Sequence, residues 1–265
     1  MNEPIDLNDV DPIELENPDI LTIYGIIKNA VYKLKDKTAV ILWSSFILLL
    51  LWGNKGNFEL LKPEWRAPLF GDLAWKNQLI NFLAGFILLV IIPCCIIKFY
   101  FKEKLSDYGL GFSRARVKLG WLALVVTLVL CLPIFYLGTL NPEMQAEYPL
   151  FRDSITTWGN FIIYELVYFL FFINIEFIFR GYLLFGLFGF SGKDSRARYF
   201  GVYAILIQML AYTMWHISKP MPEYMGTIFW GVAMAAIALK IRSIWPIIIV
   251  HWLLNVWVDV LLWLG

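Results

Sequence analysis

The chain has 265 residues, of which 60% are hydrophobic and only 16% are charged. This composition excludes a disordered chain and argues against a soluble globular domain, because several apolar runs reach or approach the roughly 20 residues that span a bilayer. The net charge of +1 gives no global field that would favour nucleic acid. We therefore expect an all-α, polytopic membrane protein that contacts the lipid bilayer and binds no nucleic acid.

The first 37 residues form a segment of their own. Seven acidic residues and no basic residue occur among the first twenty, so no cleavable signal peptide is visible and we expect the mature protein to keep this end. Residues 21–37 combine spaced apolar residues with four lysines, which indicates either charges that flank a span or an amphipathic helix on an anionic leaflet. We interpret residues 1–37 as an acidic tail followed by a juxtamembrane basic segment.

Seven apolar segments follow, and each predicts a transmembrane helix. Their bounds are about 39–53, 78–100, 119–140, 159–190, 199–217, 224–240 and 244–264. We expect Pro93 and Pro133 to kink the second and third spans, and the prolines at positions 220 and 222 predict that residues 217–223 are not helical. The predicted division is 38–140 for the amino-terminal membrane helices and 141–265 for a membrane core of four helices.

Lysine and arginine are unevenly distributed between the two sides that seven spans create. Fifteen fall on the side of residues 28–37, 98–118, 193–198 and 240–242, and six fall on the other side. Because cytoplasmic loops carry the excess of basic residues, this predicts a cytoplasmic amino terminus and an outside carboxyl terminus. Three cysteines at positions 94, 95 and 131 lie inside apolar runs, so we interpret them as packing residues.

The apolar run from about residue 161 to 190 carries two opposite charges, Glu176 and Arg180, four residues apart. Positions i and i+4 are neighbours on a helix, so the two side chains can pair and reduce each other's cost of leaving water. An ionisable group at membrane depth costs about 2.5 to 3.5 kcal/mol on insertion scales, which favours a functional site. The alternative is a buried pair that only fixes helix packing.

The two histidines of the chain fall in the same half, His216 at the end of the fifth span and His251 in the seventh. Asn255 follows His251 by four residues, a spacing that aims both side chains at one point. A glutamate, two histidines and an amide can either hold a divalent metal or activate a water and receive an oxyanion, as peptide hydrolysis requires. Taken singly, His216 is more readily explained as a hydrogen-bonded interface residue beside a polar loop, and His251 with Asn255 as an interhelical hydrogen-bonding pair. We interpret Asp259 as interfacial and solvated.

Three motifs together resemble a known family, the CPBP family of CAAX proteases and bacteriocin-processing intramembrane enzymes. They are Glu-x-x-x-Arg, aromatic-x-x-x-His and His-x-x-x-Asn, which occur in the family's order as Glu176 to Arg180, Tyr212 to His216 and His251 to Asn255. The similarity covers roughly residues 105–259. It implies a helical membrane core around an inner cavity, and proteolysis near the membrane that is either metal-dependent or glutamate-dependent.

The resemblance also implies roles for these residues. Glu176 and His216 would activate the water, His251 and Asn255 would bind a metal or stabilise the oxyanion, and Arg180 would orient the glutamate. The implied cofactor is a divalent metal, with zinc as the first candidate and Glu176, His216 and His251 as its ligands. The implied substrate is a peptide or membrane protein in a bacterial-type cell membrane, and nothing in the sequence indicates a prenyl-binding specificity.

The sequence departs from the family at one position. The family's first motif usually opens with two adjacent glutamates, and the first of them is replaced here by Ile175, which cannot take a proton. Either Glu176 acts alone, or another acid substitutes, or the fold has lost proteolysis. One candidate substitute is Glu165, which lies about 16 Å from Glu176 along a helix.

The other candidate is Glu223. It ends the segment His216-Ile217-Ser218-Lys219-Pro220-Met221-Pro222-Glu223, which is similar to a bacterial branch of the family with a single-glutamate first motif. Lys219 in the same segment and Tyr212 complete the supporting residues. We interpret the aromatic residues around Tyr212 as packing residues rather than substrate contacts.

The leading interpretation is an intramembrane endopeptidase that hydrolyses a peptide or membrane-protein substrate with a water activated by glutamate and histidine. One alternative is a proteolytically inactive membrane scaffold or regulator with the same fold, which the isoleucine at position 175 favours. The other is a transporter, in which buried glutamate, arginine and histidine relay protons. The lack of an internal repeat and the small number of spans argue against a transporter.

Overall fold

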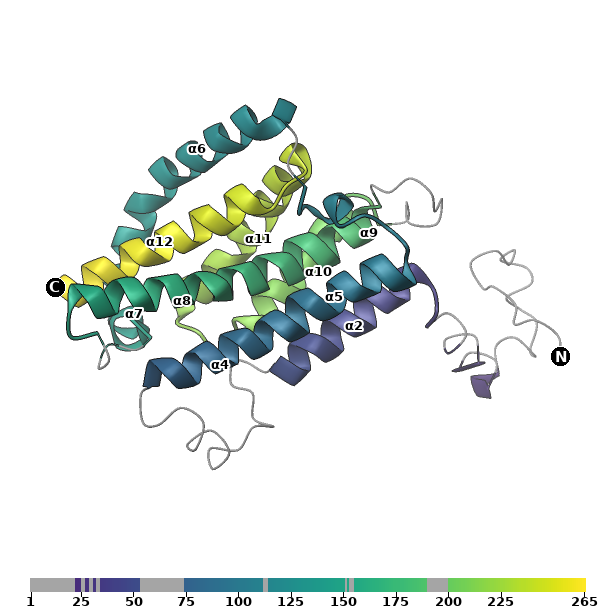
Figure 1. Ribbon diagram of the computed structural model, residues 1–265, viewed down its shortest axis with the longest axis horizontal. Coiled ribbons are helices and arrows are strands. Elements are labelled where there is room, and N and C mark those ends of the chain that lie inside the picture. Colours follow the sequence, from purple (N-terminus) through teal and green to yellow (C-terminus); the bar gives the residue numbers. More distant parts are fainter. Residues whose placement is uncertain are drawn as a thin grey trace.

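The computed structural model describes residues 22–24, 27–28, 31, 34–52, 74–111, 114–150, 152, 155–189 and 200–265. Within these ranges every regular element is a helix, as the composition predicts (Figure 1). The acidic tail, much of the juxtamembrane basic segment, and the connections over residues 53–73 and 190–199 lie outside the described residues. The predictions for those parts stay predictions.

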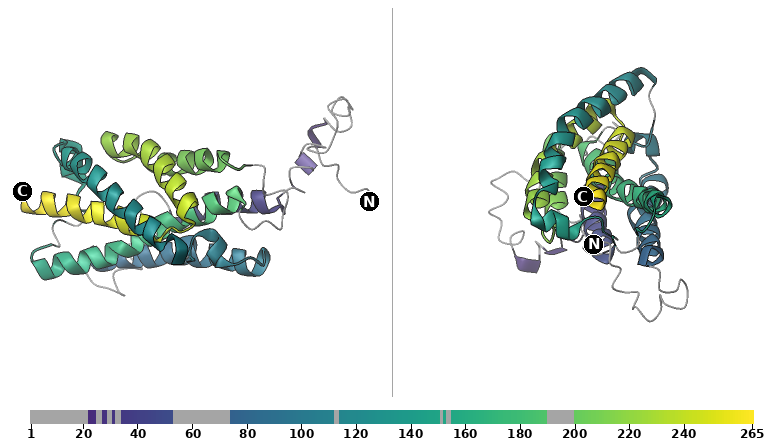
Figure 2. Two further views of the ribbon diagram at one scale, coloured as in Figure 1. Left: turned by 90° about the horizontal axis from the view of Figure 1, so that it is seen from above. Right: turned by 90° about the vertical axis from the view of Figure 1, so that its left-hand side faces the viewer.

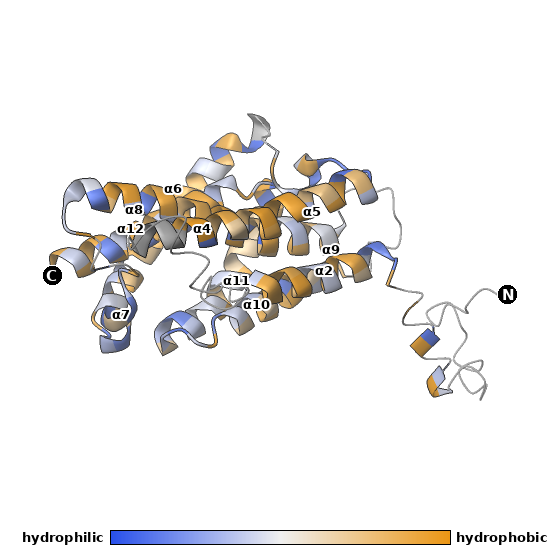
Figure 3. Cartoon of the chain, turned by 60° about the horizontal axis from the view of Figure 1, so that its bottom comes forward, coloured by the Kyte–Doolittle hydropathy of each residue, from blue (hydrophilic) through white to orange (hydrophobic). Residues whose placement is uncertain are grey.

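Five described helices are long and apolar enough to cross a membrane: Leu79–Tyr100, Arg116–Thr139, Trp158–Phe188, Met221–Ile241 and Trp245–Leu264. Two shorter apolar helices occur in the same part of the chain, Lys37–Trp52 and Tyr203–Trp215. The seven predicted spans thus correspond to five full-length and two shorter helices, and the chain is a polytopic membrane protein. Hydrophobic residues cover the helices over most of their length (Figure 3).

The first half of the chain begins with α2 (Lys37–Trp52). A long helical rod follows, made of α4 (Ala74–Phe86), the π-helical η3 (Ile87–Ile91), α5 (Ile92–Cys95) and the π-helical η4 (Ile96–Tyr100). A short 3-10 turn, η5 (Leu105–Tyr108), leads to α6 (Arg114–Thr139) and then to the short α7 (Pro142–Glu147).

The second half of the chain contains the predicted site. Its elements are α8 (Trp158–Glu176), the π-helical η7 (Phe177–Phe185), α9 (Gly186–Phe188), α10 (Tyr203–Trp215), α11 (Met221–Ile241) and α12 (Trp245–Leu264). These correspond to the four predicted carboxyl-terminal spans, with α8, η7 and α9 forming one continuous span.

The prolines have different local effects. Pro93 lies in the four-residue α5, with a π-helical segment on either side of it, whereas Pro133 lies inside the single α-helix α6. The prediction that residues 217–223 are not helical is wrong for its last three residues. Met221, Pro222 and Glu223 form the first turn of α11, because a proline in that turn has no intrahelical hydrogen bond to lose.

The bundle is built around α12, which packs between α6 and α8 (Figure 1). The far side of α8 packs against α4, while α10 packs against η7 and α11. Seen from above, α6 and α11 cross the direction of α12 obliquely (Figure 2). The largest core cluster joins Ile41 of α2, Leu89 of η3, Phe179 of η7 and Ile248 of α12. Helices from both halves of the chain therefore share one hydrophobic core, and Leu124 of α6 packs with Val250 and Leu254 of α12 in a second cluster.

Two local features bring the site residues into this core. With 13 residues α10 rises only about 20 Å, less than the ~30 Å of a hydrocarbon layer, so the residue that caps its end, His216, is buried inside the bundle. The second feature is that α8 changes to π-helical geometry directly after Glu176. Such π-helical turns occur frequently at functional sites.

Candidate active site

Glu176 is completely buried at the end of α8. Its Oε1 atom accepts a hydrogen bond from Nη1 of Arg180 at 3.3 Å and another from Nδ1 of His251 at 2.7 Å. The ion pair predicted from the i, i+4 spacing is therefore present, and it extends to a histidine on α12. Because the Nδ1 hydrogen of His251 is directed at the carboxylate, its Nε2 atom is left for a ligand or substrate.

Arg180 is held from a second side by Tyr212 of α10. The guanidinium carbon Cζ lies 4.0 Å from the centre of the phenol ring, which is a close cation–π contact, and both side chains are buried. Stacking and pairing together offset part of the cost of burying the guanidinium. Arg180 is thus placed to fix the position of Glu176, as the resemblance implies.

His216 is oriented by the helix that precedes it. Its Nδ1 atom lies 2.7 Å from the backbone oxygen of Tyr212, and a carbonyl can only accept, so Nδ1 carries the hydrogen and Nε2 carries a lone pair. The rings of Tyr212 and Trp215 pack edge-on against the imidazole. The Nε2 atom lies 3.8 Å from Oε1 of Glu223, too far for a direct hydrogen bond but close enough for both atoms to share one water.

The carboxylate of Glu223 is held by the segment that follows α7. The hydroxyl of Tyr148 donates a hydrogen bond to Oε2 of Glu223 at 2.9 Å. Nζ of Lys219 donates to Oε1 of Glu147 at 2.8 Å and to the hydroxyl of Tyr148 at 3.3 Å. Burial, reinforced by the Glu223 carboxylate, raises the pKa of Tyr148 well above its usual value, so the phenol remains a hydrogen-bond donor.

Two cavities adjoin this cluster, with volumes of about 190 Å³ and about 360 Å³. Both cavities are lined by the same five residues, Tyr148, His216, Glu223, His251 and Asn255. The amide of Asn255 uses one of its two N–H groups to donate to the backbone oxygen of His251 at 2.9 Å. The structure thus brings both predicted histidines, the predicted amide and Glu223 to a common wall.

Ile175 and Glu176 differ in what they face. Ile175, at the position of the family's usual first glutamate, lies on the wall of the smaller cavity. Glu176 lies on the wall of neither cavity, because its carboxylate is enclosed behind His251. The side chain of Glu223 is 21% exposed, compared with 0% for Glu176. Among the acids named from the sequence, Glu223 is therefore the one that faces both cavities.

Glu165 does not reach the site. It is buried in α8 beside Asp259 of α12 and lines neither cavity. The prediction that Asp259 is interfacial and solvated is wrong, since this residue is fully buried and accepts a hydrogen bond from the hydroxyl of Tyr164 at 3.0 Å. The reason is that α8 and α12 pack together over this length and enclose the polar groups between them.

The predicted zinc ligands do not fit a three-ligand metal site. Over the described ranges, no group of three His, Cys, Asp or Glu side chains is placed to hold a metal ion. Glu176 binds Nδ1 of His251 and so lies behind that imidazole instead of beside it. Only His216 and His251, two of the three predicted ligands, face the cavities.

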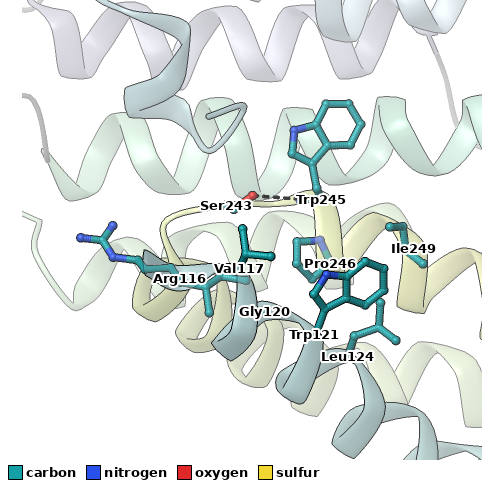
Figure 4. A pocket seen from close by; sticks show the side chains of 10 residues that line it. Arg116, Val117, Gly120, Trp121, Leu124, Ser243, Trp245, Pro246 and Ile249 are labelled. Carbon is teal, nitrogen blue, oxygen red and sulfur yellow. Dashed lines mark hydrogen bonds between the residues drawn. The ribbon is translucent and has the colours of Figure 1, made fainter. Parts of the chain in front are cut away.

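A third cavity, of about 80 Å³, lies where α6 and α12 begin (Figure 4). Arg116 is its one ionisable lining residue, and the guanidinium points away from Trp121 and Pro246. A side-chain carbon on Gly120 would lie 3.1 Å from Pro246, so the two helices approach closely here. This cavity contains none of the predicted site residues.

Sequence reasoning missed Glu147 and Tyr148, which lie in a stretch that reads only as a polar connection. A helix could have been predicted before them, because Asn141 accepts hydrogen bonds at its Oδ1 from the backbone N–H groups of Glu143 and Met144. Asparagine followed by proline is a typical helix start. No sequence signal indicates that this helix packs beside residues 219–223.

Residues 157–257 match the pattern of a protein family described as Rce1-like, type II CAAX prenyl endopeptidase Rce1-like. The similarity covers this range of the chain, which is called the Rce1-like domain below. The domain includes all of the predicted site residues, namely Glu176, Arg180, Tyr212, His216, Lys219, Glu223, His251 and Asn255. No curated protein and no solved structure matches the chain.

Proposed function

We propose that the Rce1-like domain makes this chain an intramembrane endopeptidase that hydrolyses a peptide or membrane-protein substrate inside the helix bundle. The observation that carries the proposal is the convergence of His216, His251 and Asn255 on the shared wall of two cavities. The family of the domain supports a protease, and the apolar helices support a site that is reached from within the membrane.

The site favours attack by water over a covalent intermediate. The five residues on the shared wall include no serine or cysteine, and Cys131 and Thr227 line only the larger cavity, so we take the nucleophile to be a water. Nε2 of His216 accepts a hydrogen bond from this water and orients it. The free N–H of Asn255 donates to the oxyanion that forms when the water attacks the carbonyl.

Glu176 acts through His251 in this proposal. A carboxylate 2.7 Å from Nδ1 fixes the orientation of the imidazole and holds the hydrogen on Nδ1. Nε2 of the oriented ring then faces the cavity beside Asn255, where its lone pair can accept a hydrogen bond from the substrate. This role differs from the direct activation of water that the resemblance implies for Glu176.

The larger cavity supports entry of the substrate from the lipid side. It lies between α6 and α11 and is lined mainly by apolar side chains, including Phe135 and Trp230. Two of its lining residues, Ile134 and Phe229, are 63% and 77% exposed on the apolar outer surface. An apolar segment can therefore pass from the bilayer to the histidines without leaving an apolar environment.

The function is tested by comparing the membrane proteome of cells that carry Glu176→Gln or His251→Ala with that of the parent cells. We expect the same uncut precursor to accumulate in both variants, and its cleavage by the purified chain to fall by about 10²-fold or more. Asn160→Ala, at an exposed position in the first turn of α8, is the control and should process the precursor normally. Undiminished cleavage in both site variants would refute the assignment.

The predicted zinc dependence is tested separately by metal analysis of the purified chain and of a His216→Ala/His251→Ala variant. Because no three-ligand group is formed, we expect less than about 0.1 metal ion per chain in both proteins. About one zinc ion per wild-type chain, lost in the variant, would instead support the zinc-dependent form of the reaction.

A proteolytically inactive scaffold or regulator is the second candidate, and one observation favours it: Ile175 presents an apolar side chain to the cavity where the family usually has a glutamate. In that case neither site variant would accumulate a precursor. A membrane protein that co-purifies with the wild-type chain would also co-purify with Glu176→Gln and His251→Ala.

A further inference from the structure

We propose that Glu223 is the carboxylate that takes the proton from the attacking water, in place of the glutamate that the family has at the position of Ile175. This inference rests on the proposed endopeptidase function and names a further catalytic residue within it. Three independent observations point to Glu223: its access to both cavities, its distance from His216, and the contacts that hold it in place.

The first observation concerns access. A general base must reach the water it activates. Ile175 lies on the cavity wall and has no proton acceptor, whereas Glu176 has an acceptor and is fully enclosed by Arg180 and His251. Glu223 combines both requirements, because it carries a carboxylate and lines both cavities.

The second observation is the gap of 3.8 Å between Oε1 of Glu223 and Nε2 of His216. Nδ1 of His216 already carries its hydrogen toward the backbone oxygen of Tyr212, so the two atoms that face each other across the gap are both acceptors. A single water can lie about 2.8 Å from each and donate one hydrogen to each. Such a water is held by two acceptors and has its lone pairs free for attack.

The third observation is the way in which Glu223 is held. Tyr148 occupies the other carboxylate oxygen, Oε2, and Lys219 ties Tyr148 to Glu147. Glu223 also lies in the first turn of α11, where the helix dipole favours a negative charge. These contacts hold the carboxylate in place and leave Oε1 directed toward His216. They would also suit a purely structural glutamate, so the test must separate the two roles.

In the proposed step the water oxygen forms a bond to the carbonyl carbon of the substrate while Glu223 takes one of the water protons. The π electron pair of the carbonyl moves to its oxygen, which receives the N–H of Asn255. The proton on Glu223 then passes to the amide nitrogen as the C–N bond breaks. The products are one carboxylic acid and one amine, the carboxylate of Glu223 is regenerated, and no other reactant is required.

The test compares Glu223→Gln with Glu143→Gln, a change of an exposed carboxylate on α7 that lines neither cavity. Glutamine keeps the size of the side chain and can still accept from Tyr148, so the fold should survive. With the precursor defined by the proteome comparison, we expect Glu223→Gln to lower kcat by about 10²-fold or more with KM changed less than about threefold. Glu143→Gln should keep at least about a third of the wild-type kcat, because it does not reach the water and glutamine can still accept from the backbone N–H of Met221.

The cellular readout separates this inference from the function on which it rests. Precursor that accumulates with His216→Ala but not with Glu223→Gln overturns the role of Glu223 and leaves the endopeptidase in place. Precursor that accumulates with neither variant overturns both. Accumulation with both variants, together with the predicted loss of kcat, supports the inference.

A labelling experiment on the intact wild-type chain tests access without any need for activity. Dicyclohexylcarbodiimide is an apolar reagent that adds to carboxyl groups in apolar surroundings, and peptide mass spectrometry locates the adduct. We expect the adduct on Glu223 and none on Glu176. An adduct on Glu176 with Glu223 unmodified would overturn the inference.

Discussion

Glu176 and Arg180 have no contact with solvent, so each depends on the other and on its neighbours for polar contacts. The carboxylate binds both the guanidinium and His251, and the guanidinium also stacks on Tyr212. A network of this kind fixes a histidine on α12 relative to two other helices. The same network makes the loss of either charge costly, because the remaining one stays buried.

We therefore expect Glu176→Gln to lower the free energy of unfolding by about 3–5 kcal/mol, the usual cost of leaving one partner of a buried pair uncompensated. The double variant Glu176→Gln/Arg180→Met leaves no charge at these two positions and should recover at least half of that loss. Denaturant unfolding in detergent micelles measures both values. A single variant within about 1 kcal/mol of wild type would contradict the structural role of the pair.

Tyr148 gives a prediction about pH. Burial raises its pKa well above the usual value, while an unfolded tyrosine ionises near pH ~10. Above that pH the folded chain binds one more proton than the unfolded chain, so stability falls as pH rises. Tyr148→Phe removes this contribution and should lose stability less steeply than wild type between about pH 9.5 and 11.

At neutral pH the same variant should be less stable by about 1–3 kcal/mol, because Glu223 loses its hydrogen-bond donor. Unfolding curves of Tyr148→Phe and wild type, recorded at pH 7 and across the alkaline range, give the stability difference at neutral pH and the dependence of stability on pH. Parallel pH dependences for the two proteins would show that the phenol does ionise in the folded state.

At the scale of the element, α11 contains two glycines with opposite surroundings. A side-chain carbon on Gly231 would meet Cγ of Met209 at 2.9 Å and its backbone Cα at 3.3 Å, whereas one on Gly226 would meet nothing within 4 Å. Gly231 therefore allows α11 to approach α10 closely. Gly226 lines the larger cavity.

We expect Gly231→Ala to destabilise the fold by about 1–3 kcal/mol through overpacking. Gly226→Ala should stabilise it by up to about 1 kcal/mol, because alanine restricts the unfolded chain and suits a helix better than glycine. Thermal unfolding of the two variants side by side gives the comparison. Equal effects would mean that α10 and α11 do not pack at Gly231.

The short length of α10 also has a functional consequence. A helix that crossed the whole hydrocarbon layer would carry its final residue to the membrane surface, away from the buried Glu176. Since α10 ends at Trp215, His216 instead caps it inside the bundle and meets Glu223 at the start of α11. The connection between two helices thus supplies part of the site.

At the scale of the whole molecule, the distribution of basic residues predicts the orientation in the membrane. Alkaline phosphatase, which is active only outside the cytoplasm, should be active when fused after Gly265. It should be inactive when fused to the amino terminus. The reverse pair of activities would show that the orientation is inverted, whereas the same result at both ends would show that the number of membrane crossings is even and therefore not seven.

Hydropathy is enough to establish that this chain is helical and crosses a membrane, because a long apolar segment in lipid must satisfy its backbone hydrogen bonds within itself. Motif spacing is enough for the Glu176 and Arg180 pair, since contacts between positions i and i+4 are local to one helix. It also selects His216, His251 and Asn255, all of which line the cavities.

The orientation of the site residues toward the cavities is determined by packing between helices, which depends on residues far apart in the sequence. Consecutive residues on a helix point about 100° apart, and only the positions of α11 and α12 place Ile175 on the cavity wall and Glu176 behind His251. In the same way Tyr148 meets Glu223 across 75 residues of sequence. These long-range contacts move the cavity-facing carboxylate from the first motif to the start of α11.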